Sequence, residues 1–232
     1  MSVAIEDNQV HVWQVNLKTV RGTASEFTGT LSPDELERAG KFKFPGDREH
    51  FILSHSQLRL ILSKYCDCLP GEFNFRYNSC RKPSISNPEF EKLKFNMSHS
   101  NDLMLVGLCN HNDIGIDVEK VREVHELENI ADENFSAQEI KYIKDASDKT
   151  NTFFKIWTRK EAFIKAIGKG IHFPLKSFCV ELKSPGSLEH LVILHHPSWR
   201  DQWRTSELII SDGYTASLAI NSDRFKISYF QL

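Results

Sequence analysis

The stretch FFKIWTRKEAFIKAIGKG, residues 153–170, places the strongest constraint on the fold of this chain. Its apolar residues recur with helical spacing, which predicts a helix that buries one face in a core and ends near Gly-Lys-Gly. Four charged residues interrupt this apolar pattern, namely Arg159, Lys160, Glu161 and Lys165. The chain therefore has to cover the aromatic face of this helix with other elements, and the charged positions call for a separate explanation.

Bulk composition excludes several classes of protein. A chain of 232 residues forms one large domain or two small ones. A formal net charge of −2 provides no general basic field, so nucleic acid is not an expected partner. No apolar run approaches the roughly 20 residues of a membrane-spanning helix, and the N-terminus lacks the pattern of a signal peptide. Five scattered cysteines favour reduced thiols, so we expect a cytoplasmic protein.

Capped helices occur in a similar order in both halves of the chain. Ser32 and Glu35 have the spacing of a capping box, and a longer helix is expected at about residues 47–65. Ser136 and Glu139 repeat that spacing, and the helix described above follows them. The order indicates a weak duplication, although one sequence does not prove it.

Strand patterns fill most of the remaining chain and make the expected class α+β. Strands are predicted at residues 9–17, 73–77, 93–100, 103–109, 113–120, 178–182, 191–194, 206–211, 214–220 and 226–230.

Two carboxylates lie close together on one predicted strand. Asp117 and Glu119 are two residues apart, so both side chains point to the same face. Adjacent carboxylates repel each other unless a cation lies between them, and oxygen-only ligands suit Mg²⁺. The alternative is that both acids are solvated on an exposed sheet face, which is the more common arrangement.

The helix at residues 153–170 adds a third carboxylate. Glu161 and Lys165 are four residues apart and share one helix face. Taken alone they fit a surface ion pair. Combined with Asp117 and Glu119, they make a coherent site in which three acids hold a metal while Lys160 and Lys165 neutralise phosphate oxygens.

These residues resemble a known family. GIDVEK at 115–120 and WTRKEAFIK at 157–165 are similar to the two-part signature of 4′-phosphopantetheinyl transferases of the surfactin-synthetase-activating type. FNMSHS at 95–100 is similar to a third motif of that family. RKP at 81–83 resembles a fourth, in which the family more often has Gly before Lys-Pro. The match extends loosely over residues 31–182.

The resemblance implies both a fold and a reaction. The fold is two similar α/β halves related by a pseudo-twofold axis, each a small antiparallel sheet packed with helices, with coenzyme A in the cleft between them. Residues 1–112 would form the half on the adenine and 3′-phosphate side, and residues 113–232 the half on the magnesium, pyrophosphate and carrier side. The reaction moves the phosphopantetheine arm of coenzyme A to a serine of an apo acyl or peptidyl carrier protein and releases adenosine 3′,5′-bisphosphate.

The resemblance also implies roles for individual residues. The metal, Mg²⁺ or alternatively Mn²⁺, would be held by Asp117, Glu119 and Glu161. The coenzyme would contact Asp117, Ser98, His99, Lys160 and Lys165 at its phosphates, and Arg48 and Lys82 at its 3′-phosphate end. The catalytic residues would be Glu161, Lys165, Glu119 and Glu139.

Two of these assignments stay open at the level of sequence. Glu139 corresponds to a family glutamate proposed as the base for the attacking serine, but its spacing from Ser136 favours a helix cap, which contributes roughly 0.5–2 kcal/mol. Glu119 or a metal-bound water would then accept the proton. Arg81, where the family more often has Gly, alters the loop and leaves the role of Lys82 open.

The partners are less well defined than the chemistry. Acyl carriers of fatty-acid synthesis and carrier domains of polyketide or nonribosomal peptide synthases are all candidates, and the sequence does not choose among them. The carrier is expected to bind near residues 135–142, with Ile140 and Ile143 as test positions. A monomer is expected, because two fused halves already enclose a cleft. His55, His111, His195 and His196 have no motif and are assigned no role.

Two other classes of function compete with the transferase. Exonucleases that use two metal ions also carry Asp-x-Glu on a strand, but in the first strand of the fold, whereas here it lies mid-chain. A non-catalytic binding module would use the same acids only for surface solvation. Such a module predicts no magnesium-dependent response to coenzyme A.

Overall fold

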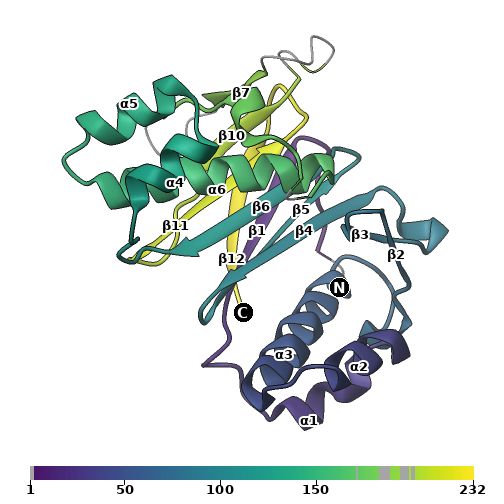
Figure 1. Ribbon diagram of the computed structural model, residues 1–232. Coiled ribbons are helices and arrows are strands. Elements are labelled where there is room, and N and C mark those ends of the chain that lie inside the picture. Colours follow the sequence, from purple (N-terminus) through teal and green to yellow (C-terminus); the bar gives the residue numbers. More distant parts are fainter. Residues whose placement is uncertain (1–2, 171, 183–188, 194–198, 200–201) are drawn as a thin grey trace.

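Two four-stranded sheets form the framework of the protein, and helices cover the outer face of each (Figure 1). The computed structural model describes residues 3–170, 172–182, 189–193, 199 and 202–232. In chain order the elements are β1 (Gln9–Asn16), α1 (Ala24–Phe27), α2 (Pro33–Gly40), α3 (Pro45–Leu62), β2 (Phe75–Tyr77), β3 (Pro83–Ile85), β4 (Leu93–Ser100), β5 (Leu103–Asn110), β6 (Ile114–Lys120), α4 (Leu127–Asn134), α5 (Ala137–Asp145), α6 (Lys149–Ile167), β7 (Phe178–Cys179), β8 (Glu189–His190), β9 (Val192–Ile193), β10 (Arg204–Glu207), β11 (Tyr214–Ile220) and β12 (Lys226–Gln231).

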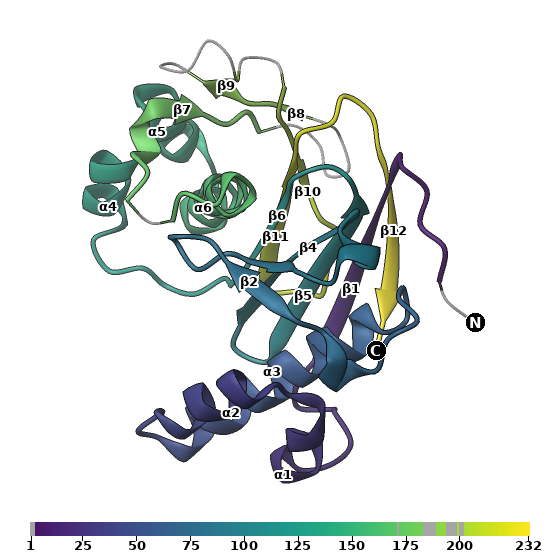
Figure 2. The same cartoon turned by 90° about the vertical axis from the view of Figure 1, so that its right-hand side faces the viewer.

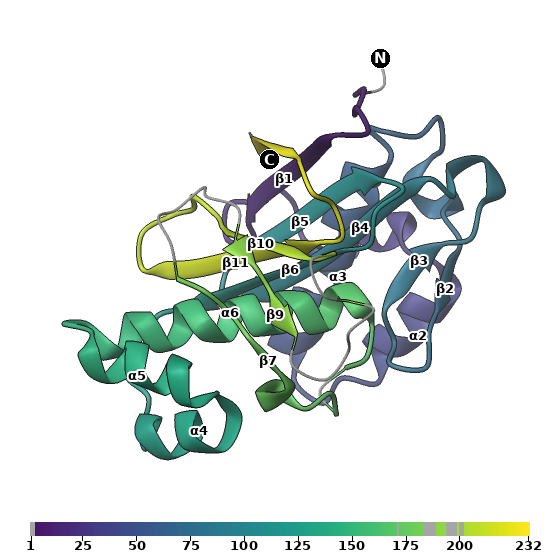
Figure 3. The ribbon, with the colours of Figure 1, turned by 90° about the horizontal axis from the view of Figure 1, so that it is seen from above.

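The sheets pack face to face between two sets of helices. The first sheet has the order β12-β1-β5-β4 and the second β6-β11-β10-β8. Val12, Leu105 and Ile116 belong to the apolar cluster between the sheets. On the outer face of the first sheet, α3 contributes Leu58 to a second cluster, and on the outer face of the second, α6 contributes Phe163 to a third. Figures 2 and 3 show α4 to α6 gathered around the second sheet and α1 to α3 around the first.

The two halves repeat one topology, as the sequence indicated. Each begins with a strand, continues through a capped helix and a long helix, and ends with two antiparallel strands, of which the second pairs with the first strand of that half. In the first half these are β1, α2, α3, β4 and β5, and in the second β6, α5, α6, β10 and β11. The long helices are nearly equal, at 18 and 19 residues. The fold is therefore α+β with two similar halves, as predicted.

The C-terminal strand departs from this division. β12 runs parallel to β1 in the first sheet, with Gln9 opposite Lys226 (Figure 2). Its hydrogen bonds fill the edge of β1 that faces away from β5, an edge that would otherwise leave backbone groups unpaired. The predicted boundary between residues 112 and 113 lies in the turn between β5 and β6. It assigns each four-stranded sheet to one half, except that β12 follows the boundary in sequence but belongs to the first sheet. The division into two domains stays a prediction.

Several elements begin and end where the sequence patterns placed them. β4 and β11 coincide with the predicted strands at residues 93–100 and 214–220. The long helix of the first half starts earlier than predicted, because Pro45 fits the first turn of a helix, where no backbone N–H is needed. None of the helices in the described part of the chain combines the length and apolar character needed to cross a bilayer.

Gly115 allows β6 to lie directly against α6. A Cβ atom at this position would be 2.0 Å from the carbonyl oxygen of Ala162 and 2.4 Å from the amide nitrogen of Ala166, both backbone atoms of α6. The helix that carries Glu161 therefore depends on a bare backbone at position 115.

We expect Gly115→Ala to force α6 away from the sheet and to lower the free energy of unfolding by about 3 kcal/mol, as overpacked cores do. The matched control is Gly46→Ala in the first turn of α3, where no atom lies within 4 Å of the added Cβ. That variant should be as stable as the wild type or slightly more stable. Urea unfolding of both variants measures the difference, and equal stabilities would contradict the close contact.

Candidate functional site

Side chains of β4 join the two sheets at the point where the candidate site lies. The amide of Asn96 accepts a hydrogen bond from the Ile116 backbone N–H at 2.8 Å. The Ser98 hydroxyl donates to Asp117 Oδ1 at 2.9 Å, and the Ser100 hydroxyl donates to a Glu119 carboxylate oxygen at the same distance. The motif FNMSHS thus holds β6 in register beside β4. Sequence analysis did not anticipate this role, because side-chain bridges between two sheets leave no periodic signal.

Asp117 is the best-defined carboxylate of the site. It is only 4% exposed. Its Oδ1 accepts from Ser98 and lies 2.6 Å from the ammonium of Lys165, which also donates to the Ser98 hydroxyl at 2.8 Å. Its buried Oδ2 has no hydrogen-bond partner among the described residues. A buried carboxylate oxygen without a donor is costly unless something positive approaches it.

Glu161 completes the group of acids. Burial raises the pKa of its carboxyl, and the nearby charge of Asp117 raises it further, while Lys165 opposes this and Glu119 adds to it. Mutual repulsion of this kind requires the three carboxylates to lie near one another. Asp117, Glu119 and Glu161 therefore lie near one another, and Lys165 contacts Asp117. The joint binding of a metal by these three acids stays a prediction.

The donor set fits a hard divalent cation, although the side chains do not form a closed cage. Among the described residues, no three acidic, histidine or cysteine side chains are close enough together to hold a metal ion. The available ligands are nevertheless all carboxylate oxygens, which suit Mg²⁺. The unpartnered Oδ2 of Asp117 is the atom that a cation would satisfy. Binding would require the carboxylates to draw closer together.

His99 lies beside this group at the exposed edge of β4. Its ring packs edge-on against that of His50, with 4.6 Å between ring centroids. Burial, together with the neighbouring charges of His50 and Lys165, lowers the pKa of His99 to about 4. The imidazole is therefore neutral at pH 7, next to the lysine of the site.

A hollow of about 300 Å³ opens between the two halves at this point. Its lining comes from α2, α3, β2, β3, β4, α6 and the segments after β2 and α6. It comprises Arg38, His55, Tyr77, Cys80, Arg81, Lys82, Pro83, Asn96, Met97, Glu161, Ile164, Lys165, Gly168 and Gly170. Four of these residues are cationic and one is acidic, so the hollow suits an anionic ligand. Arg38 and His55 were not assigned to the site from the sequence, because neither belongs to a motif.

Lys160 is a correction to the sequence analysis. Its side chain is 0% exposed, and its ammonium contacts Glu139 at 2.9 Å and the carbonyl oxygens of Leu175 and Phe178 at 2.9 and 2.8 Å. All three N–H donors are thereby engaged inside the core, so Lys160 does not reach a phosphate in this arrangement. Burial lowers the pKa of its ammonium, although the charge of Glu139 opposes that shift.

The first half contains the counterpart of this buried pair. Arg59 of α3 donates to Glu35 at 2.7 Å and to the carbonyl oxygens of Pro70 and Phe73 at 2.8 and 3.0 Å. In both halves, a cation of the long helix thus joins the capping glutamate of the short helix to the loop after the long helix. The duplicated fold explains why Lys160 is buried one residue before Glu161.

Glu139 serves as the helix cap that its spacing favoured. It is 0% exposed. One carboxylate oxygen accepts from the Ser136 backbone N–H at 2.8 Å, and the other accepts from the Val180 N–H at 2.8 Å and contacts Lys160. A carboxylate engaged in this way has no access to a carrier serine, so the assignment of Glu139 as catalytic base does not fit the structure.

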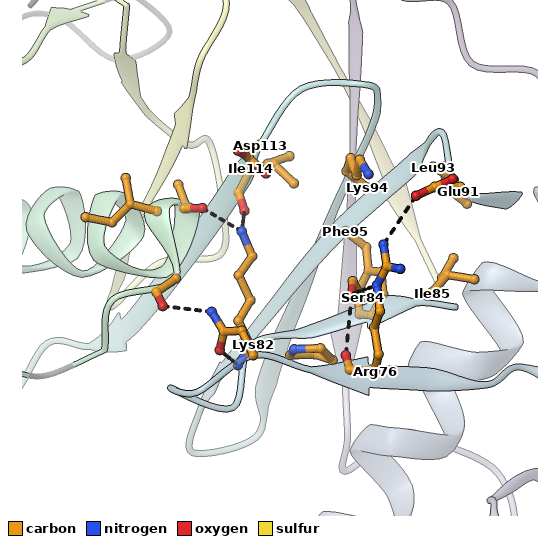
Figure 4. A pocket seen from close by; sticks show the side chains of 15 residues that line it. Arg76, Lys82, Ser84, Ile85, Glu91, Leu93, Lys94, Phe95, Asp113 and Ile114 are labelled. Carbon is orange, nitrogen blue, oxygen red and sulfur yellow. Dashed lines mark hydrogen bonds and ion pairs between the residues drawn. The ribbon is translucent and has the colours of Figure 1, made fainter. Parts of the chain in front are cut away.

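Lys82 is a second correction. Its ammonium donates to the carbonyl oxygens of Ile114 at 3.0 Å and Ala166 at 2.6 Å, so it ties the loop after β2 to the second half (Figure 4). Burial lowers its pKa. The side chain forms a wall between the hollow described above and a second one of about 270 Å³, which Figure 4 shows. Two of its three ammonium donors are thus engaged by backbone carbonyls, which the sequence analysis did not anticipate.

Arg48 lies apart from the hollow between the halves. It is exposed, and it lines a separate hollow with Phe42, Lys43 and Pro45 at the start of α3. It is not among the residues that line the hollow between the halves. Its contact with the 3′-phosphate of the coenzyme stays a prediction.

Part of the predicted carrier-binding surface at residues 135–142, and one of its two test positions, is buried. Phe135 and Ile143 are 1% and 2% exposed and belong to the core under α6. Glutamate at Ile143 would disrupt packing, so the double substitution suggested by the sequence does not test carrier binding. His55, which was assigned no role, bonds to Glu35 at 2.9 Å, whereas His195 and His196 lie outside the described residues.

Comparison with known proteins gives the context of this site. The 4′-phosphopantetheinyl transferase superfamily matches residues 113–219. The chain is 32% identical over 228 residues to the 4′-phosphopantetheinyl transferase HetI of Nostoc sp., covering 94% of this chain and 90% of that protein. It is also 32% identical to the transferase Sfp of Bacillus subtilis, covering 70% and 71% of the two chains.

A holo-[acyl-carrier-protein] synthase of Thermotoga maritima is among the similar solved structures. It has a TM-score of 0.39 at 22% identity and covers 48% of this chain and 64% of that chain.

Proposed function

This chain belongs to the 4′-phosphopantetheinyl transferase superfamily, and we propose that it transfers the phosphopantetheine arm of coenzyme A to a serine of apo carrier proteins. The observation that carries the proposal is the grouping of Asp117, Glu119 and Glu161 with Lys165, two of which, Glu161 and Lys165, line a hollow rich in cations. A pyrophosphate ester with a metal ion needs this combination of acids and cations.

The reaction has a simple balance of bonds. The serine oxygen of the carrier attacks the phosphorus that bears the pantetheine arm, and the bond from that phosphorus to the bridging oxygen of the pyrophosphate breaks. Adenosine 3′,5′-bisphosphate leaves with the electron pair. The serine gives up its proton, for which Glu119 is the available acceptor, because Glu139 is buried. The side chain of Glu119 is 26% exposed at the rim of the site.

The residues of the chain contribute position and charge. Lys165 already holds its ammonium at 2.6 Å from Asp117, where it would stabilise negative charge on the departing bisphosphate. Ser98 orients both of these groups through its hydroxyl. His99, neutral at pH 7, lies where it would donate a hydrogen bond to a phosphate oxygen.

The proposal includes magnesium, with manganese as an alternative, held by Asp117, Glu119 and Glu161. Such an ion makes the pyrophosphate a better leaving group by neutralising its charge. The support is the unpartnered Oδ2 of Asp117 and the all-oxygen ligand set. The chain would act as a monomer in the cytoplasm. The five free cysteines, all within the described residues, agree with a reducing compartment.

Intact mass spectrometry tests the function. The protein is incubated with coenzyme A, Mg²⁺ and apo carriers from fatty-acid, polyketide and nonribosomal peptide pathways. We expect at least one carrier to gain the mass of one phosphopantetheine group, and EDTA to prevent the gain. A binding module that uses these acids only for surface solvation would show no magnesium-dependent thermal shift with coenzyme A and no change in any carrier.

A further inference from the structure

Arg81 occupies a backbone conformation that its residue type rarely adopts. Its φ is 65°, in the left-handed region that favours glycine. The turn around it is closed by Asn78, whose side-chain oxygen accepts from the backbone N–H groups of Cys80 and Lys82 at 2.9 and 2.8 Å. A glycine would fit this turn with less strain. The arginine side chain makes no hydrogen bond or ion pair with the described residues, so nothing in the fold requires it.

The same side chain lies at the junction of two hollows. Arg81, Arg38 and Tyr77 line both the hollow of about 300 Å³ between the halves and a neighbouring one of about 510 Å³ beside α2. The other cations of the first hollow are engaged. Lys82 contacts backbone carbonyls, Lys165 contacts Asp117, and Arg38 lies 5.1 Å from the ring centroid of Phe51. Of these four cations, only Arg81 has a side chain that makes no hydrogen bond, ion pair or ring contact with the described residues, so its guanidinium is the one least engaged by the fold.

Its position relative to the acids of the site is held by contacts between the halves. The side-chain nitrogen of Asn78 donates to the Gly168 carbonyl at 2.8 Å, and the Cys80 thiol donates to the Lys169 carbonyl at 3.0 Å. Both acceptors follow directly after α6, which carries Glu161 and Lys165. The loop with Arg81 is therefore bonded to the end of the helix that carries Glu161 and Lys165.

This inference rests on the proposed function. Coenzyme A carries a pyrophosphate and, on its ribose, a 3′-phosphate monoester. With the pyrophosphate at Glu161 and Lys165, the 3′-phosphate has to be met elsewhere in the hollow. A guanidinium binds a phosphate through two parallel hydrogen bonds. We propose that Arg81 binds the 3′-phosphate and thereby makes the protein distinguish coenzyme A from dephospho-coenzyme A.

Calorimetric titration with the two nucleotides, in the presence of Mg²⁺ and without carrier, tests the proposal. Arg81→Gln keeps the backbone strain but removes the charge, and it should weaken coenzyme A binding roughly 10- to 100-fold. Binding of dephospho-coenzyme A should change by less than about twofold, because the ligand lacks the group that Arg81 contacts.

Arg81→Gly removes both the charge and the strain. It should lose affinity to the same extent, and its melting temperature should be roughly 2–4 °C above that of Arg81→Gln. Arg224→Gln, at an exposed arginine in the turn before β12, makes the same change in net charge and should bind both ligands as the wild type does.

Three results would overturn the inference. Unchanged coenzyme A binding by Arg81→Gln would show that Arg81 does not contact the coenzyme. Equal losses of affinity for both nucleotides would show that Arg81 contacts a part of the ligand other than the 3′-phosphate. A loss confined to Arg81→Gly would show that only the loop backbone matters. If the wild type bound neither nucleotide, the proposed function would fail as well, whereas a wild type that binds coenzyme A with unaffected Arg81 variants would refute this inference alone.

Discussion

Glu161→Gln is expected to reduce the rate of phosphopantetheine transfer by about 10²–10³-fold, the loss seen when one group that stabilises charge in a transition state is removed. Glutamine has nearly the same shape but no negative charge, so the group of three acids would keep only Asp117 and Glu119. Burial and the neighbouring acids already raise the pKa of Glu161. Its neutral replacement should therefore not destabilise the fold.

The measurement is the initial rate of mass gain on one apo carrier at several Mg²⁺ concentrations. The half-saturating Mg²⁺ concentration should rise in Glu161→Gln, and urea unfolding should show wild-type stability or better. Glu6→Gln is the control, because that carboxylate is exposed near the N-terminus and lines neither hollow of the site. A Glu161→Gln enzyme with wild-type rate and wild-type magnesium response would exclude this residue from the site.

Glu139→Ala should lower the free energy of unfolding by about 3–5 kcal/mol, because it leaves the ammonium of Lys160 buried without an anion. The substitution also removes the acceptor for the backbone N–H groups of Ser136 and Val180. The corresponding change in the first half, Glu35→Ala, leaves the guanidinium of Arg59 buried without its carboxylate partner and should lower the free energy of unfolding by a similar amount.

The double variant Glu139→Ala with Lys160→Met separates the two parts of that loss. Removing the buried charge together with its partner should recover part of the stability, since methionine fits an apolar site. Stability is measured by urea unfolding, and transfer is measured per folded molecule well below the melting temperature. If Glu139→Ala kept its stability and lost transfer, the glutamate would be the catalytic base and the assignment as a cap would be wrong.

The acidic part of the site followed from local patterns. Alternation along a strand puts Asp117 and Glu119 on one face wherever that strand lies, and helical spacing does the same for Glu161 and Lys165. The caps at Ser32 and Ser136 are equally local, since each depends on a residue three positions away. Only the approach of strand and helix had to be inferred, and the family resemblance supplied it.

The lysines and arginines were harder to place. Lys82, Lys160 and Arg48 are all cations within or near motifs, yet two of them bind backbone carbonyls and the third lies over a different hollow. A long flexible side chain reaches several angstroms in any direction, so its position in sequence says little about where its charge lies. The buried pair of Arg59 and Glu35 shows that a cation in a long helix can serve the core alone.

The sequence alone determined the elements, their repeated order and the acids that share a face, because each depends on spacing along a few residues. The tertiary structure decided which partner each charge takes and which sheet receives β12, whose partner β1 lies more than 200 residues earlier in the chain. It also decided that Arg81 faces a hollow shared by both halves. Such contacts join distant segments, and their geometry is set by how the two sheets pack, which no local pattern records.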